Sequence, residues 1–170
     1  LLPFEPCVLG SINLLNMLTE KDGRWEVDFD KIRMTVKYAV HFLDNVIDMN
    51  QYPLPQISQM AKGNRKIGLG VMGLAHFLIR LGLSYHSQKA LEVIRGLMSF
   101  IQYQAREQSV ELAEKRGVFL NFKDSIYDKP GGMRLRNATL TTIAPTGTLS
   151  LLANCSSGIE PLFAIQYTRK

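Results

Sequence analysis

Two long helical patterns constrain the fold of this chain more than any other feature. Asp28 precedes residues 29–50, in which apolar side chains recur at the spacing of one helical face. Ser87 opens the longest predicted element, which Gly117 ends as a C-terminal cap. We therefore expect two long helices, over residues 29–50 and 87–116.

Shorter stretches supply the remaining predicted elements. Residues 67–83 are Gly-rich but continuously apolar at helical period, which predicts a buried helix, and the β-branched run of residues 138–143 predicts a strand. A short strand or loop is expected around residues 7–9, with a helical turn after Ser11. The pattern is that of a helix-rich α/β fold. No repeat or low-complexity linker divides the chain, so we expect residues 1–170 to form a single piece.

The composition argues against several classes of protein. With 46% hydrophobic and 21% charged residues, it is ordinary for a soluble globular domain. No apolar run approaches the roughly 20 residues of a membrane span, and no signal-peptide pattern opens the chain, so a cytoplasmic protein is expected. The net charge of +5 suits an anionic partner. Because the basic residues are scattered, they disfavour a nucleic-acid-binding surface and are at least as compatible with a small anionic ligand.

Two groups of residues could suggest a metal site. Cys7 and Cys155 lie far apart and form no CxxC pair, which leaves a structural zinc site unsupported. His41, Asp44 and Asp48 fall on one face of the first long helix, where an exposed polar face is the expected arrangement. We predict no metal site.

The glycines Gly68, Gly70 and Gly73 spell the GxGxxG fingerprint of dinucleotide-binding proteins. That fingerprint needs a strand before it, and the two residues Lys66-Ile67 are too short to form one. The glycines also lie within the run predicted to be helical, where they would permit close packing. We therefore do not predict a dinucleotide site.

A stronger candidate site follows the predicted strand over residues 138–143. A Gly-containing turn that leads into a helix presents free backbone N–H groups at the positive end of the helix dipole, and this arrangement binds phosphate. Hydroxyl groups add further donors. The alternative, a capped turn without a ligand, stays open. The residues concerned are Pro145, Thr146, Gly147, Thr148, Leu149 and Ser150.

Three stretches that together span most of the chain resemble the large catalytic subunit of ribonucleotide reductase. They are LLPFEPCVLGSINL at residues 1–14, RKIGLGVMGLAHFLIRLG at residues 65–82 and IAPTGTLSLLANCSSGIEPLFA at residues 143–164. The resemblance is closest to the adenosylcobalamin-dependent branch, class II. Val8 stands where the family usually has Asn, and His76 where an acidic residue is common, but neither position carries a chemical group of the mechanism.

The resemblance implies a fold and an activity. Members of the family fold as a ten-stranded α/β barrel of two half-barrels, and this chain would form the C-terminal part of that barrel. The implied reaction is the radical reduction of ribonucleoside diphosphates to 2′-deoxyribonucleoside diphosphates, with adenosylcobalamin and an external dithiol such as thioredoxin. The missing N-terminal half of the barrel and the effector-binding segments would complete the enzyme. We accordingly expect both ends of this chain to be cuts through a longer protein. The chain alone is expected to be inactive.

The resemblance also implies roles for particular residues. Cys7 would be one half of the redox pair that ends as a disulfide, and Leu9 would pack against the substrate. The turn from Pro145 to Ser150 would cradle the substrate phosphates through the backbone N–H groups of residues 146–150 and the hydroxyls of Thr146, Thr148 and Ser150. Cys155 would have no redox role.

Two other interpretations stay open from the sequence. One is a helix-rich phosphate-binding or scaffold module that carries out no redox chemistry. The other is the same region of a class I reductase subunit, which needs a separate metal-radical protein.

Overall fold

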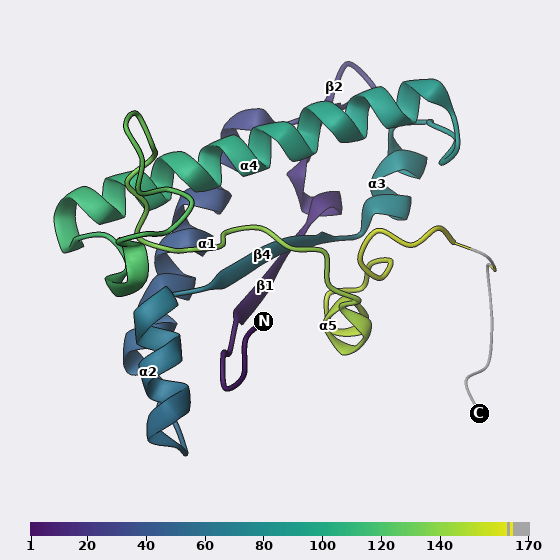
Figure 1. Ribbon diagram of the computed structural model, residues 1–170. Coiled ribbons are helices and arrows are strands. Elements are labelled where there is room, and N and C mark those ends of the chain that lie inside the picture. The colour runs from purple at the N-terminus through teal and green to yellow at the C-terminus, as the bar shows by residue number, and fades with distance from the viewer. Residues whose placement is uncertain (163, 165–170) are drawn as a thin grey trace.

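The computed structural model describes residues 1–162 and residue 164 (Figure 1). Helices and strands are mixed, as the predicted helix-rich α/β class requires, and the described strands do not close into a barrel. In chain order the elements are β1 (Val8–Asn13), the 3-10 helix η1 (Leu14–Met17), β2 (Leu18–Lys21), β3 (Arg24–Val27), α1 (Phe29–Met49), α2 (Pro55–Asn64), β4 (Ile67–Met72), α3 (Leu74–Arg80), α4 (Gln88–Arg116), the 3-10 helix η2 (Leu120–Phe122) and α5 (Gly147–Leu152).

The main sheet is parallel and has β4 at its centre. β1 pairs with β4 along the full length of both strands. On the other side of β4 runs the extended segment 139–142, which joins the strand through a bridge between Thr141 and Leu69. The backbone N–H groups of Ile67 and Leu69 donate to carbonyls of this segment at 3.2 and 2.8 Å. The predicted strand over residues 138–143 is thus confirmed only as an extended, partly paired segment.

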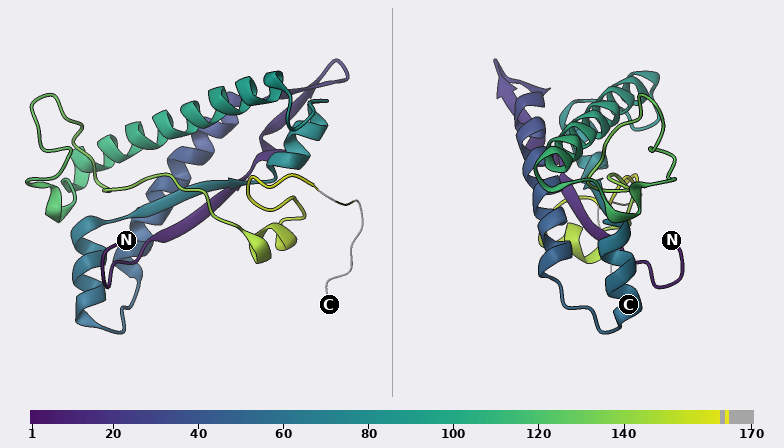
Figure 2. Two further views of the ribbon diagram at one scale, coloured as in Figure 1. Left: turned by 45° about the vertical axis from the view of Figure 1, so that its right-hand side comes forward. Right: turned by 60° about the vertical axis from the view of Figure 1, so that its left-hand side comes forward.

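The two long helices form a layer over one face of this sheet (Figures 1 and 2). Both start at a side-chain cap, since Asp28 Oδ1 accepts the Lys31 N–H at 2.9 Å and Ser87 Oγ accepts the Ala90 N–H at 3.1 Å. α4 ends at Gly117, whose φ of +82° suits glycine. Both predicted helices are confirmed. Their buried faces meet the sheet in the core, which includes Ile32, Val36, Val40, Leu97, Ile101 and Leu69.

The predicted buried helix over residues 67–83 is wrong. Its first part forms β4, every residue of which is buried, and only Leu74–Arg80 is helical. A continuous apolar run is also typical of a strand covered on both faces in a parallel sheet, so the helical period alone could not separate the two structures.

The fingerprint glycines consequently lie elsewhere than expected. Gly68 and Gly70 belong to β4 itself, and Gly73, with φ +80°, turns the chain from the strand into α3. A dinucleotide-binding turn instead places its glycines after the strand, beside the pyrophosphate. Gly68 and Gly70 are therefore part of the sheet, and Gly73 alone lies in the turn that follows it.

The smaller elements lie around this core. β2 and β3 form an antiparallel hairpin, and Trp25 of β3 stacks under the Arg80 guanidinium of α3, 4.7 Å from the ring centroid. The short helix α5 lies on the side of the sheet opposite the α1 and α4 layer (Figure 2). Within residues 1–162 and 164, no helix is both long enough and apolar enough to span a membrane.

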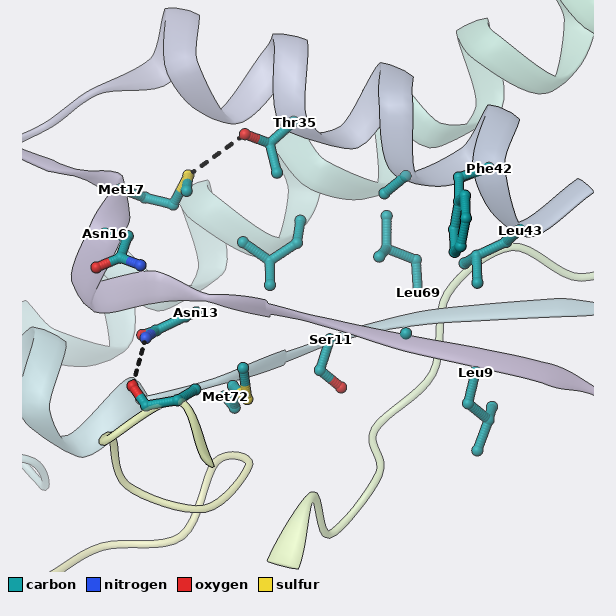
Figure 3. A pocket seen from close by; sticks show the side chains of 14 residues that line it. Leu9, Ser11, Asn13, Asn16, Met17, Thr35, Phe42, Leu43, Leu69 and Met72 are labelled. Atoms are coloured by element: carbon teal, nitrogen blue, oxygen red, sulfur yellow. Dashed lines mark hydrogen bonds between the residues drawn. The ribbon is translucent and has the colours of Figure 1, made fainter. Parts of the chain in front are cut away.

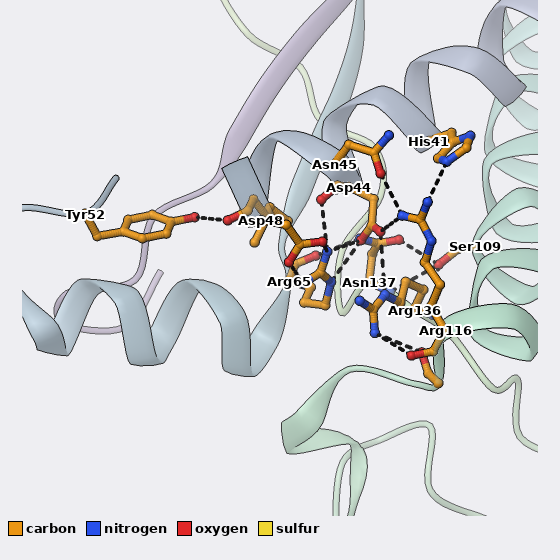
Figure 4. A network of polar contacts seen from close by, with 12 residues as sticks. His41, Asp44, Asn45, Asp48, Tyr52, Arg65, Ser109, Arg116, Arg136 and Asn137 are labelled. Carbon is orange, nitrogen blue, oxygen red and sulfur yellow. Dashed lines mark hydrogen bonds and ion pairs between the residues drawn. The ribbon is translucent and has the colours of Figure 1, made fainter. Parts of the chain in front are cut away.

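A buried network of charged and polar groups joins α1 to the starts of β4 and the segment 139–142 (Figure 4). Asp44 of α1 is fully buried, and its carboxylate lies 2.8 Å from the guanidinium of Arg65, just before β4. The same carboxylate accepts a hydrogen bond from Asn137 Nδ2 at 2.9 Å. Arg116 of α4 reaches it at 3.3 Å. The network therefore aligns two helices with two neighbouring strand starts.

The exposed polar face predicted for α1 is wrong for Asp44, because α4 and the chain around Asn137 cover it. Asp48 is half exposed, as expected, and pairs with Arg65 at 2.8 Å. His41 Nε2 accepts a hydrogen bond from Arg116 at 3.0 Å. The three residues thus serve one ion-pair network, and no group of three metal-ligating side chains occurs in the described part of the chain.

Candidate functional site

One face of the sheet is free of the long helices, and β1 presents polar and apolar side chains on it. Leu9 and Ser11 point to the side away from α1 (Figure 3). Leu9 is 56% exposed although it lies within a strand. Asn13, two residues further along, donates to the carbonyl of Ala153 at 3.3 Å and so ties the end of α5 to this face.

Glycine in β4 makes this face possible. A Cβ atom on Gly68 would lie 2.7 Å from Leu9 Cδ2 and 2.8 Å from Thr142 Cγ2. The side chains of Leu9 and Thr142 therefore close over Gly68 from the two neighbouring strands. Any larger residue at position 68 would displace the side chain of Leu9 or that of Thr142.

Cys7 lies at the amino end of β1, two residues before Leu9, and is half-buried and free. Side chains alternate along a strand, so positions 7, 9 and 11 share one face. Burial raises the pKa of the Cys7 thiol. The positive charge of Lys66 lowers the pKa of the thiol, while the negative charge of Glu5 raises it further. The thiol therefore lies among groups that tune its ionisation.

The predicted phosphate turn forms a short loop and the start of α5. Thr146 is the N-cap residue in the left-handed conformation, at φ +54°. The first amide to enter the helix is that of Ser150, which donates to the Thr146 carbonyl at 2.8 Å. The amides of Gly147, Thr148 and Leu149 precede it, and helix geometry leaves such groups without an intrahelical acceptor. Pro145 and these three residues are exposed.

The hydroxyl groups of the turn differ in their availability. Thr146 Oγ1 accepts the Gly158 N–H at 2.7 Å, and the buried Ser150 Oγ donates to the Gly147 carbonyl at 3.1 Å. Ser150 Oγ also lies 2.9 Å from Ser157 Oγ. Among the described residues, no hydrogen bond engages the exposed Thr148 hydroxyl. Two of the three predicted hydroxyls therefore support the turn itself.

Residues 156–158 hold this turn against the start of α3 and were not predicted as part of the site. The Gly73 N–H donates to the Ser156 carbonyl at 2.7 Å, and the Ser156 N–H donates to His76 Nδ1 at 3.0 Å. Cys155 is half-buried against Gly73, and burial raises the pKa of its thiol. The run of small residues CSSG at positions 155–158 was the signal in the sequence for this role.

Two cavities adjoin these elements. One, of about 470 Å³, runs between β1 and α1 and is lined by Leu9, Asn13, Met17, Thr35, Phe42 and Met72 among others (Figure 3). The other, of about 630 Å³, lies beside α5 and α3.

Cys7 and the turn thus lie at opposite ends of one parallel arrangement. Cys7 precedes β1, and the turn follows the segment 139–142, with β4 between them. Leu9 lies on the face between the two. An elongated ligand whose anionic end met the turn could lie across Leu9 and reach the thiol with its other end.

The sequence matches known proteins over nearly its whole length. The model of the family described as "Ribonucleotide reductase, barrel domain" matches residues 4–170. The vitamin B12-dependent ribonucleoside-diphosphate reductase of Thermoplasma acidophilum is 50% identical over 169 residues, which is 99% of this chain and 22% of that protein. The protein of the same name in Mycobacterium tuberculosis H37Rv is also 50% identical, over 99% of this chain and 23% of its own length.

More distant relatives carry another name. The ribonucleoside-diphosphate reductase subunit alpha of Chlamydia pneumoniae is 31% identical over 92% of this chain and 18% of its own length. The chain therefore spans less than a quarter of the length of each of these three relatives.

Proposed function

The chain belongs to the ribonucleotide reductase barrel-domain family, and from this premise we propose that it forms part of an enzyme that reduces ribonucleoside diphosphates to 2′-deoxyribonucleoside diphosphates. Residues 1–170 would be one piece of the catalytic barrel, its C-terminal part. The observation that carries the proposal is the open face of the sheet, which has a free thiol at one end, an exposed leucine in the middle and, at the other end, a turn whose amides begin a helix.

In this proposal Cys7 supplies one of two reducing thiols. Removing the 2′-hydroxyl of a ribonucleotide as water and replacing it by hydrogen consumes two electrons and two protons. Two thiols supply both when they form a disulfide. The second thiol would come from the part of the barrel that precedes this chain, and an external dithiol such as thioredoxin would reduce the disulfide again.

The turn would bind the diphosphate. The amides of the exposed residues 147–149 and the Thr148 hydroxyl would serve as donors at the positive end of α5. Thr146 and Ser150 would act indirectly, because their hydroxyls hold the turn to Gly158 and Ser157. Leu9 would pack against the nucleoside between the two ends.

The names of the B12-dependent relatives support a cobalamin cofactor, and we propose nucleotide effectors as further partners. Adenosylcobalamin would supply the radical when bound to the complete enzyme, and nucleotide effectors would bind elsewhere on it. Neither of the two cavities described above is a closed site for so large a cofactor, so we assign it no residue of this chain. Among the described residues β1 pairs with β4 alone, and its other edge supports a place for further strands, as a ten-stranded barrel requires. We place the complete enzyme in the cytoplasm.

The proposal is tested by assaying the complete enzyme that contains this chain. With a labelled ribonucleoside diphosphate, adenosylcobalamin and dithiothreitol, it should form deoxynucleotide, and omission of adenosylcobalamin should stop the reaction. The 170-residue chain alone should form none.

Other results would favour other interpretations. Product that requires a metal-radical protein in place of adenosylcobalamin would assign the chain to a class I enzyme, in agreement with its similarity to alpha subunits. No product under either condition would favour a phosphate-binding or scaffold module.

Replacing Thr148 by valine tests the turn. The substitution keeps the shape of the exposed side chain and removes a hydrogen-bond donor. It should therefore raise the KM for the ribonucleoside diphosphate about five- to tenfold. This change corresponds to a net hydrogen-bond contribution of about 1 kcal/mol. The kcat should change little. Thr19→Val in β2, distant from the turn in the fold, serves as the control and should leave KM unchanged. Equal KM values for the two variants would contradict a role of the Thr148 hydroxyl in binding.

A further inference from the structure

A buried ion pair lies next to Cys7. The Glu5 side chain is fully buried, and its carboxylate lies 2.9 Å from Lys66 Nζ. It also accepts the Leu2 N–H at 2.8 Å and a hydrogen bond from Asn64 Nδ2. These donors and the positive charge hold the pKa of Glu5 below its usual value although burial raises it. Glu5 therefore carries a negative charge at neutral pH.

The backbone fixes this pair beside the thiol. The Val8 N–H, immediately after Cys7, donates to the Lys66 carbonyl at 3.2 Å. Lys66 thus lies opposite the first residues of β1, and Glu5 precedes Cys7 by two residues. Of the charged groups in the described part of the chain, these two act on the Cys7 thiol, the lysine favouring the thiolate and the glutamate disfavouring it.

Stability alone does not explain the pair. Glu5 is fully buried and Lys66 is 21% exposed, and the desolvation of such charges offsets much of their mutual attraction. A lysine and a glutamate beside a thiol have a second consequence, because the thiolate is the form that exchanges with disulfides.

We propose that Lys66 and Glu5 are positioning residues that set the reactivity of Cys7, with Lys66 promoting the thiolate and Glu5 limiting it. The inference rests on the proposed function of Cys7 as a redox thiol. When the thiolate of an external dithiol attacks the partner sulfur of the Cys7 disulfide, the sulfur–sulfur bond breaks and its electron pair goes to Cys7 Sγ. The Lys66 ammonium would stabilise the thiolate that leaves.

The test measures the alkylation of Cys7 in the reduced complete enzyme with iodoacetamide from pH 6.5 to 9.5, with the Cys7 peptide quantified by mass spectrometry. Lys66→Met leaves Glu5 unopposed and should slow alkylation at pH 7.5 about three- to tenfold, which is the change in thiolate fraction for half to one pKa unit. Glu5→Gln should accelerate it by a similar factor. The rise of the alkylation rate with pH should shift to higher pH in Lys66→Met and to lower pH in Glu5→Gln.

Matched variants separate charge from disruption. The pair Lys37–Glu111 joins α1 to α4 at 3.0 Å, far along the fold from Cys7, and Lys37→Met and Glu111→Gln should leave the Cys7 rate unchanged. Lys66→Arg keeps the positive charge, so its rate of Cys7 alkylation should be close to that of the parent protein. Cys155 in the same molecules provides an internal reference for general loosening of the structure.

Local unfolding would expose the thiol and accelerate alkylation in both variants, so a slower rate in Lys66→Met is the decisive result. Acceleration in both, or no change in either, would overturn the proposal. The readout does not require turnover, and activity of the Cys7→Ser enzyme decides the proposed function separately.

Discussion

Serine in place of Cys7 should abolish dithiol-dependent turnover of the complete enzyme, by more than about a thousandfold, as expected when a reacting group is removed. Serine has nearly the same shape, and the half-buried position at the head of β1 accepts its hydroxyl, so the fold should persist. A hydroxyl cannot form a disulfide, and the two electrons for the reduction then have no source. Deoxynucleotide formed per hour with excess dithiothreitol is the measurement.

Cys155→Ser is the matched control for this prediction. Cys155 is also half-buried and free, and it lies against Gly73 on the far side of the turn. Its replacement should leave most of the turnover. An active Cys7→Ser enzyme would remove Cys7 from the mechanism and would favour the binding-module interpretation.

Alanine in place of Asp44 should destabilise the fold by about 3–5 kcal/mol, the range measured when one partner of a buried ion pair is removed. The substitution leaves Arg65 buried beside only Asp48, and it deprives Asn137 of an acceptor. Both residues stand directly before strands of the main sheet. The change should appear as a lower urea midpoint and as faster proteolysis of the loop between α4 and α5.

Asp30→Ala provides the comparison for Asp44. Asp30 pairs with Arg33 at 2.7 Å, but its side chain is 87% exposed, and exposed pairs contribute about 0–1 kcal/mol. If Asp44→Ala lowers the free energy of unfolding no more than Asp30→Ala does, the buried network does not stabilise the sheet. Asp44→Asn keeps an acceptor oxygen, so its loss of stability should lie between those of Asp30→Ala and Asp44→Ala.

The long helices could be predicted because local signals determine them. Caps at Asp28 and Ser87 and a glycine at position 117 fix their ends, and periodic apolar residues fix the buried face. β4 could not be predicted in this way. It is buried on both faces, so its sequence lacks the alternation that identifies a strand, and only its pairing with β1 and the segment 139–142 reveals it.

Buried charge was the second feature beyond the reach of the sequence. Nothing local distinguishes Asp44 from Asp48, since both lie on one face of α1. The difference arises because α4 and Asn137 arrive from distant parts of the chain and cover only Asp44. For the same reason Glu5 and Lys66, which are separated by 60 residues in sequence, carried no signal of a pair.

The candidate site was predicted largely through the family resemblance. Physical reasoning alone marked the turn at residues 145–150 as a possible anion site, and for Cys7 it argued only against a structural zinc site. The supporting roles of Ser157 and Gly158 required the folded chain, because their partners are the hydroxyls of Ser150 and Thr146.

The parallel pairing of β1 with β4 also sets a fixed distance along the sheet. At about 3.3 Å per residue, the six residues of β1 span about 20 Å, and they fix the distance between the thiol end and the turn end of the face. Removing Val8 would shorten this span and would also put the side chains of Cys7 and Leu9 on opposite faces of the sheet. Changes in chain length should therefore be tolerated in the largely exposed loop of residues 123–133, and not in these strands.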